Sequence, residues 1–199
     1  MASSADRNIF LGKFVLFVLA LVPFVLLGWE TFNDQLGPNP VETLQRRTGI
    51  WTFNFLMLAL SISPLRDISG LSWLVRFRRM IGLFAFFYGL LHLFSFVFFD
   101  HSLELAGILQ DIRDRRFIAV GFLAWLLLLP LAATSSNWAI KLLGGRRWQV
   151  LQRLAYVVAV LGAVHYFWLS KGTALLWPIG YATVLAVLFG WRILKRARS

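Results

Sequence analysis

Residues 86–99 read FFYGLLHLFSFVFF, an almost unbroken run of aliphatic and aromatic side chains with a histidine, His92, near its centre. Besides this histidine, only Tyr88 and Ser95 offer a polar side-chain atom in the run. Burying a polar group without a partner costs roughly 2–7 kcal/mol, so His92 needs a compensating interaction. The run therefore predicts a helix in lipid and a specific role for His92.

The composition extends the first expectation to the whole chain. Of the 199 residues, 59% are hydrophobic and 15% are charged, and the mean hydropathy is +0.71. A soluble domain carries about 25% charged residues. The apolar residues form long runs with charges clustered between them, which is typical of a polytopic membrane protein. The net charge of +11 therefore indicates topology determinants rather than a nucleic-acid partner.

Six apolar segments are long enough to cross a membrane as helices. We predict an all-α integral membrane protein, a six-transmembrane-helix bundle in a single domain (1–199), with spans at about 9–29, 48–64, 80–99, 117–133, 148–169 and 174–193. The first resembles a signal peptide, but no small-residue cleavage site follows Trp29, so a retained anchor is expected. The second and fourth spans are short, which predicts a thin or tilted crossing.

Lysine and arginine set the expected orientation. They are more numerous in the N-terminus, in 65–79, in 134–147 and in the C-terminal tail than on the opposite side. Because the richer side faces the cytoplasm, both termini are expected there. His92 and His165 then lie in the outer half of the third and fifth spans at broadly similar depth, which makes them a candidate pair.

Three uses compete for these two histidines, because an ionisable residue inside the bilayer is a functional hypothesis by default. Axial ligation of haem iron needs two neutral imidazoles on different helices. A proton relay would need carboxylates or further histidines, and no Asp or Glu lies inside any expected span. A structural histidine would bond to a neighbouring helix. The absence of cysteine excludes disulfides, Cys-ligated metals and covalently attached c-type haem.

A glycine precedes each histidine by three residues, Gly89 in GLLH and Gly162 in GAVH. Residues at i and i−3 share a helix face, so these glycines would leave room for a planar macrocycle; close helix packing is the alternative. His101, just beyond the third span, is expected to be a solvated loop residue. Four outer-side cations could contact haem propionates or, equally well, lipid headgroups: Arg113, Arg115, Arg116 and Lys171.

Three stretches carry a resemblance to a known family: TGIWTFNFLMLALSISPLR (48–66), RRMIGLFAFFYGLLHLFSF (78–96) and GGRRWQVLQRLAYVVAVLGAVHYFW (144–168). The sequence resembles the haem-binding membrane subunits of bacterial protein-methionine-sulfoxide reductase systems, the MsrQ (YedZ) family of the ferric-reductase-like transmembrane superfamily. The resemblance implies a bacterial inner-membrane subunit with haem b and FMN. Such a subunit takes electrons from the quinone pool and passes them to a periplasmic molybdopterin-containing subunit, MsrP, which reduces methionine sulfoxide in oxidised proteins.

The chain departs from this family at one position. The family has a third histidine in a WQxLH-type motif near the inner end of the fifth span, where this chain has Gln152 in WQVLQR. Glutamine is a poor iron ligand, so we expect one firmly held haem, on His92 and His165, and a second that is weak or absent. The candidates for a second-haem or other cofactor site are Gln152, Arg153, Arg78 and Arg79.

Two other interpretations stay open beside an electron-transfer subunit that performs no substrate chemistry of its own. One is a stand-alone ferric reductase of the same superfamily. Such enzymes usually carry a flavin- and nicotinamide-binding domain, and this chain has no G-x-G-x-x-G strand–helix unit. The other is a non-redox membrane scaffold, in which the histidines only bond between helices.

Overall fold

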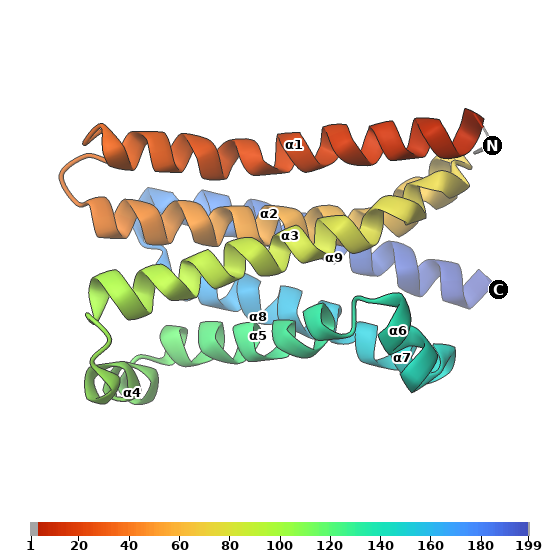
Figure 1. The fold of residues 1–199 in the computed structure, drawn as a ribbon. Coiled ribbons are helices and arrows are strands. Elements are labelled where there is room, and N and C mark those ends of the chain that lie inside the picture. The colour runs from red at the N-terminus through yellow and green to blue at the C-terminus, as the bar shows by residue number, and fades with distance from the viewer. Residues whose placement is uncertain (1–3, 199) are drawn as a thin grey trace.

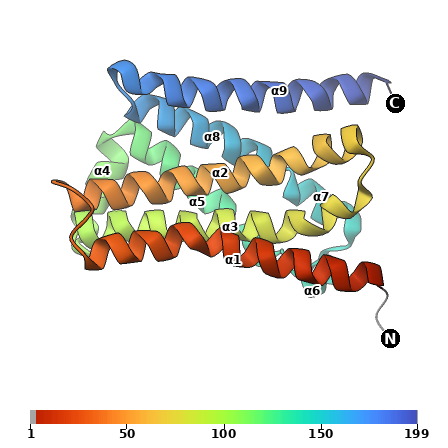
Figure 2. The same ribbon diagram turned by 90° about the horizontal axis from the view of Figure 1, so that it is seen from above.

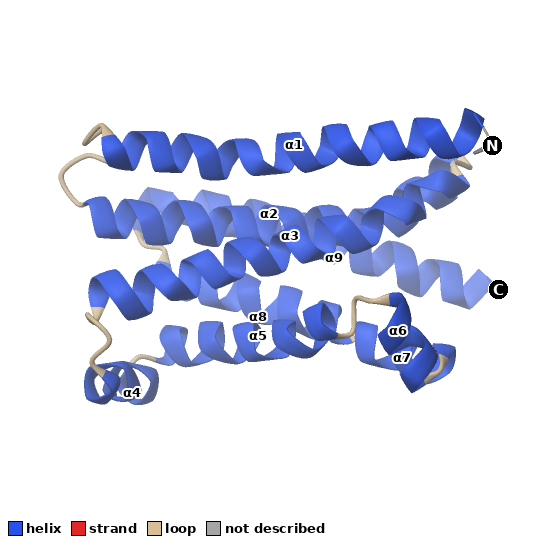
Figure 3. Cartoon of the chain, in the orientation of Figure 1, coloured by secondary structure: helices blue, strands red, loops and turns tan. Residues whose placement is uncertain are grey.

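The computed structural model describes residues 4–198. Helices joined by short loops make up this part of the chain, and it has no strand (Figure 3). Its α-helices are α1 (Ser4–Phe32), α2 (Pro40–Ser69), α3 (Val75–Phe94), α4 (Leu105–Asp114), α5 (Arg116–Ala133), α6 (Asn137–Leu143), α7 (Gly145–Gln152), α8 (Leu154–Leu169) and α9 (Leu176–Arg198). Shorter 3-10 or π-helical turns cover η1 (Ser72–Leu74), η2 (Ser95–Asp100) and η3 (Gly172–Leu175).

Six helical segments of the described chain are long and apolar enough to cross a membrane, which confirms the predicted number of spans. The chain is therefore a multi-pass membrane protein. The segments run beyond the predicted boundaries at most ends: Asp6–Phe32, Pro40–Ser69, Ser72–Asp100, Arg116–Ala133, Gly145–Leu169 and Gly172–Ala197. Both ends of the chain lie at the same end of the bundle (Figure 1), as an even number of crossings requires. Their cytoplasmic location stays a prediction.

The prediction of a short second span is wrong, because α2 has 30 residues. Its helix begins well before the apolar segment: Pro40 occupies the first turn, and the Asn39 side chain accepts a hydrogen bond from the Glu42 amide. It ends at Gly70, whose φ of 71° favours glycine. Capping signals outside the apolar run therefore set the length of α2, and hydropathy alone underestimates it.

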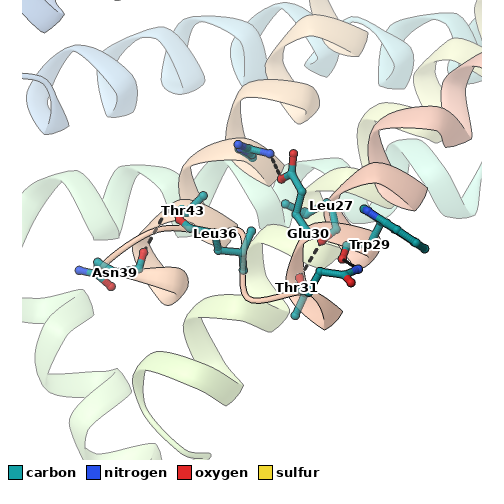
Figure 4. A network of polar contacts seen from close by, with 9 residues as sticks. Leu27, Trp29, Glu30, Thr31, Leu36, Asn39 and Thr43 are labelled. Atoms are coloured by element: carbon teal, nitrogen blue, oxygen red, sulfur yellow. Dashed lines mark hydrogen bonds and ion pairs between the residues drawn. The ribbon is translucent and has the colours of Figure 1, made fainter.

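Polar contacts close the hairpin between α1 and α2 (Figure 4). The Thr43 hydroxyl donates to the Leu36 carbonyl (2.9 Å), and the Thr31 hydroxyl donates to the Leu27 carbonyl (2.7 Å). Glu30 forms an ion pair with Arg47 of α2. The two hydroxyl bonds satisfy backbone carbonyls near the end of α1, and the ion pair joins α1 to α2; together they fix how the chain turns into the second crossing.

The helix α4 was not predicted and lies at the end of the bundle opposite the chain ends, where Figure 1 shows it nearly end-on. Its axis therefore runs across those of the long helices. Ile108 is buried, whereas Leu105 and Leu109 are exposed on the same apolar face. The segment is amphipathic and too short to span a bilayer, so hydropathy alone does not reveal it.

Two helix pairs make the centre of the bundle. The helices α2 and α3 pack along one another, as do α5 and α8, while α1 and α9 lie at opposite edges (Figure 2). In the first pair the Phe55 ring stacks with Tyr88 at 5.3 Å between centres and with Phe84 at 5.5 Å. Each pair carries one of the two intramembrane histidines.

The hydroxyl of Tyr88 is inserted into the hydrogen-bond ladder of α1. It donates to the Ala20 carbonyl (2.7 Å) and accepts from the Phe24 amide (3.1 Å), two groups that would pair directly in an undisturbed helix. Pro23, which lacks an N–H, lies between them and weakens this turn. Tyr88 is completely buried and thereby ties the peripheral α1 to α3.

A second proline leaves a backbone carbonyl of α2 without its usual helical donor, and a side chain of α9 supplies a donor instead. The Leu60 carbonyl of α2 would normally accept from residue 64, but that residue is Pro64, which has no N–H. The Arg192 guanidinium donates to this carbonyl instead (2.6 Å) and lies 4.8 Å above the centre of the Tyr156 ring. Arg192 thus fastens α9 to α2.

Candidate functional site

His92 and His165 line one cavity of about 490 Å³, here named the histidine cavity. It lies between α2, α3, α5 and α8, with α9 contributing Tyr181. The centres of the two imidazole rings are 6.1 Å apart and their planes are inclined by 77°. Residues that are 73 positions apart in sequence thus face one space, as their matched depth predicts.

His92 is oriented by the helix beside it. Its Nδ1 lies 2.9 Å from the Gln45 carbonyl of α2. A carbonyl can only accept, so Nδ1 carries the proton and donates, and Nε2 keeps its lone pair. The ring also lies against Gly49, where an added Cβ would be 3.1 Å from Cε1 and 3.2 Å from Nδ1 of His92.

His165 is oriented in the same way by α5. Its Nδ1 donates to the Phe117 carbonyl at 2.6 Å, so this ring has the same tautomer as His92. A Cβ added at Gly121 would lie 2.6 Å from Nδ1 and 2.7 Å from Cε1 of His165, far closer than a real side chain can approach.

The two helix pairs therefore repeat one arrangement. Each histidine bonds to the carbonyl of one residue on the neighbouring helix and packs on the glycine four positions later, Gln45 with Gly49 and Phe117 with Gly121. The sequence interpretation missed Gly49 and Gly121, because it looked for glycines on the histidines' own helices. In the sequence these residues are simply glycines near the start of the second and fourth predicted spans, and this position does not reveal that they contact the histidines.

The two predicted glycines also border the histidine cavity. A Cβ at Gly162 would lie 3.2 Å from the Phe53 ring, and one at Gly89 would lie 3.4 Å from Leu128 and Thr52. Both positions thus have close neighbours from other helices. The close neighbours agree with the alternative that these glycines allow helices to pack closely. Their position beside the cavity agrees with the interpretation that they leave room for a macrocycle.

The predicted propionate contacts divide into two groups. Arg115 and Lys171 line the histidine cavity, whereas Arg113 and Arg116 are exposed and do not border it. Arg113 donates to Asp114 (2.9 Å), and this bond lowers the pKa of the Asp114 carboxyl. One further cation, Arg46, lines the cavity and was not predicted.

Two buried donors of the histidine cavity have no hydrogen-bond partner among the described residues, the Gln45 side-chain amide and the Trp125 indole N–H. A buried donor without a partner costs about 1–3 kcal/mol, so such groups mark a place where a polar ligand atom would be stabilised. Neither residue was singled out from the sequence.

His101 was predicted to be a solvated loop residue, and the predicted solvent exposure is wrong. Its side chain is 15% exposed, and Nε2 lies 3.2 Å from Asp111 of α4. Its ring centre is 4.6 Å from that of Phe96. The unpredicted helix α4 folds over it, which sequence patterning could not show.

A second cavity, of about 840 Å³, lies toward the end of the bundle that holds the chain ends. We name it the arginine cavity, because Arg76, Arg78, Arg79 and Arg153 line it. All four candidates for a second cofactor site border it, since Gln152 does so as well. The Gln152 amide donates to the Thr134 hydroxyl at 3.2 Å and lies 3.4 Å from the Leu131 carbonyl.

Residues 47–163 match the family described as "Ferric reductase like transmembrane component", a region that includes His92 and ends two residues before His165. A protein of Azospira oryzae is 54% identical over 186 residues, which cover 94% of this chain and 80% of that protein, and is named protein-methionine-sulfoxide reductase heme-binding subunit MsrQ.

The chain belongs to the MsrQ family. A second MsrQ protein, from Herminiimonas arsenicoxydans, is 50% identical over 94% of this chain and 88% of its own length. A third, from Xanthomonas euvesicatoria, is 40% identical over 98% and 91%, respectively. The family resemblance stated from the sequence is thereby confirmed, and the MsrQ relatives match almost all of the chain.

Proposed function

We propose that this chain is the haem-bearing electron-transfer subunit of a protein-methionine-sulfoxide reductase system. The paired imidazoles carry the proposal. An imidazole nitrogen binds a metal at about 2 Å and lies about 1 Å from its ring centre, so two opposed ligands place their centres about 6 Å apart. The observed separation is 6.1 Å.

The tautomers support the same role. In metal sites a ligating histidine usually donates its other N–H to a carbonyl or carboxylate, which fixes the ring. His92 and His165 each donate Nδ1–H to a backbone carbonyl, so both present Nε2 as the free lone pair. A purely structural histidine would need only one hydrogen bond. Such a role would not require both rings to have the same tautomer and to face the same cavity.

The rest of the histidine cavity fits a haem. Arg46 and Lys171 are the cations available to its propionates, and the unpartnered donors of Gln45 and Trp125 can bond to its polar edge. Arg115 also lines the cavity but forms an ion pair with Asp111 (3.1 Å). A haem here would be held without covalent attachment, because the chain has no cysteine, and the family resemblance implies haem b. When bound, the haem supplies one-electron transfer; the protein holds, orients and shields it.

We propose a single haem. Gln152 stands where the family's third histidine would be, its amide donates to the Thr134 hydroxyl just past the end of α5, and no histidine is among the described residues lining the arginine cavity. The remaining parts of the proposal rest on the resemblance: the inner membrane, the quinone pool and FMN on the electron-supplying side, and the periplasmic MsrP subunit as acceptor. The cytoplasmic location of the chain ends rests on the distribution of lysine and arginine.

The test is the haem content and spectrum of the purified protein beside His92→Ala and His165→Ala. We expect about one haem per chain with a six-coordinate spectrum in the unmodified protein, and loss of that coordination in each variant. Unchanged spectra in both variants would leave only a structural role for the histidines. Reduction of the periplasmic subunit by the reduced protein would then distinguish this function from that of a stand-alone ferric reductase.

A further inference from the structure

The arginine cavity collects positive charge from several parts of the chain. Lys13 comes from α1 and Arg153 from the junction of α7 and α8, while the start of α3 contributes three arginines. No Asp or Glu is among the described residues that line it. The basic residues of the nearby segment 141–147 do not border it. Basic residues at this end of the bundle therefore do not all face the cavity.

Much of this charge has no acidic partner within residues 4–198. Arg76 pairs with Asp6 (3.3 Å) and Arg79 donates to Asn137 (2.8 Å), but no ion pair involves Lys13, Arg78 or Arg153 in this part of the chain. A cavity with unpaired cations favours an anionic ligand over a neutral one.

A further cation lies behind the wall of the cavity. Arg192 contacts Leu60 and Tyr156, both of which line the cavity. One of its terminal nitrogens, Nη1, is buried without a hydrogen-bond partner among the described residues. Arg192 therefore places one more positive charge beside the residues that line the cavity.

The other side of the cavity is apolar and open. Met80, Leu83 and Phe86 of α3 line it, and Leu83 is 39% exposed. A Cβ added at Gly82 would meet nothing within 4 Å. Since α3 crosses the membrane, this open face is accessible from the bilayer, and a ligand there needs an apolar part beside its anionic group.

We propose that the arginine cavity binds an anionic phospholipid, with its phosphate among Lys13, Arg78 and Arg153 and an acyl chain along Leu83 and Phe86. Basic pockets between transmembrane helices bind such headgroups by the same charge complementarity. The volume, about 840 Å³, lies within the roughly 300–1,000 Å³ of ligand sites. The inference does not depend on the haem, and its test can succeed or fail separately.

The experiment compares two variants that each lose three positive charges at the same end of the bundle. The cavity variant is Lys13→Gln/Arg78→Gln/Arg153→Gln, and the control is Lys141→Gln/Arg146→Gln/Arg147→Gln. The full chain is reconstituted in nanodiscs of phosphatidylcholine mixed with phosphatidylglycerol, and retained lipid is counted by native mass spectrometry. Circular dichroism and thermal unfolding of each preparation report folding, so the folding control does not depend on the haem.

We expect the unmodified chain and the control to retain phosphatidylglycerol, and the cavity variant to bind it roughly a hundredfold more weakly, since each basic group near an anionic headgroup contributes about 1 kcal/mol. Equal retention by both variants, or equal loss, would overturn the proposal. Recovery of FMN instead of phospholipid, recognised by its visible absorption, would also overturn it. If the triple variant does not fold, Arg78→Gln and Arg153→Gln are compared singly with Arg147→Gln.

Discussion

Gly121 lies directly against the ring of His165: a Cβ at this position would be 2.6 Å from Nδ1. The ring cannot move aside without breaking its bond to the Phe117 carbonyl. His92 of α3 is held in the same way by a carbonyl and a glycine of α2, those of Gln45 and Gly49. Two backbone segments, rather than two side-chain partners, therefore orient the proposed iron ligands.

Gly121→Ala is expected to displace His165 and to weaken haem retention by roughly tenfold or more, which is the usual cost of losing an outer partner of a metal ligand. The measurement is haem per chain and the reduced absorption spectrum after purification. Gly190→Ala in α9 is the control, because a Cβ there meets nothing within 4 Å. Full haem content with an unchanged spectrum in Gly121→Ala would contradict the proposed packing.

Gly49→Ala is expected to have the same effect to a smaller degree. Its added Cβ would lie 3.1 Å from the His92 ring, a distance that a shift of a few tenths of an ångström relieves. The spectrum of this variant should therefore lie between those of Gly121→Ala and the unmodified protein. A greater loss of haem than in Gly121→Ala would show that the steric ranking is not what controls retention.

Arg192→Leu is expected to destabilise the bundle because it leaves the Leu60 carbonyl without a donor. Pro64→Ala supplies an N–H to that carbonyl, so the substitution at Arg192 should cost less in the Pro64→Ala background. A double-mutant cycle on thermal unfolding in detergent should give a coupling of about 1 kcal/mol. The lost contact with Tyr156 is common to both backgrounds and cancels. Additive effects would disprove the compensation.

Tyr88→Phe is expected to loosen α1 at a cost of about 1 kcal/mol, since α1 can close its own ladder between Phe24 and Ala20 once the hydroxyl is gone. Faster proteolysis or hydrogen exchange confined to α1, with the haem spectrum preserved, is the expected signature. Tyr156→Phe is the matched control, because its hydroxyl forms no hydrogen bond among the described residues. Equal exchange rates in α1 for Tyr88→Phe and unmodified protein would argue against the anchor.

The sequence predicted the six crossings and paired His92 with His165, because long apolar runs and matched depth are local properties that hydropathy and helix geometry translate directly. It did not predict Gly49, Gly121, Tyr88 or Arg192 in their roles. Each acts on a different helix from the group it serves, and the pairing of helices is decided by packing in three dimensions.

The error at α2 and the omission of α4 have a different cause. Caps at Asn39 and Gly70 lengthen α2 beyond its apolar segment, and α4 is amphipathic rather than uniformly apolar. The length of α2 and the presence of α4 both depend on polar residues, which a search for membrane spans treats as the ends of spans. Predicting these two features requires a separate search for helix caps and amphipathic segments outside the apolar runs.

The two cavities share only the side chains of Leu56 and Leu128 among their described lining residues. Leucine side chains have no hydrogen-bonding group, so these shared residues offer no hydrogen-bonded chain along which a proton could pass between the cavities. Under the proposed function, each electron that moves outward therefore travels without a compensating proton. The resting potential, negative inside, would drive such a charge outward by about 2.3 kcal/mol for each 100 mV crossed, so under the proposed function sulfoxide repair would respond to the energisation of the membrane.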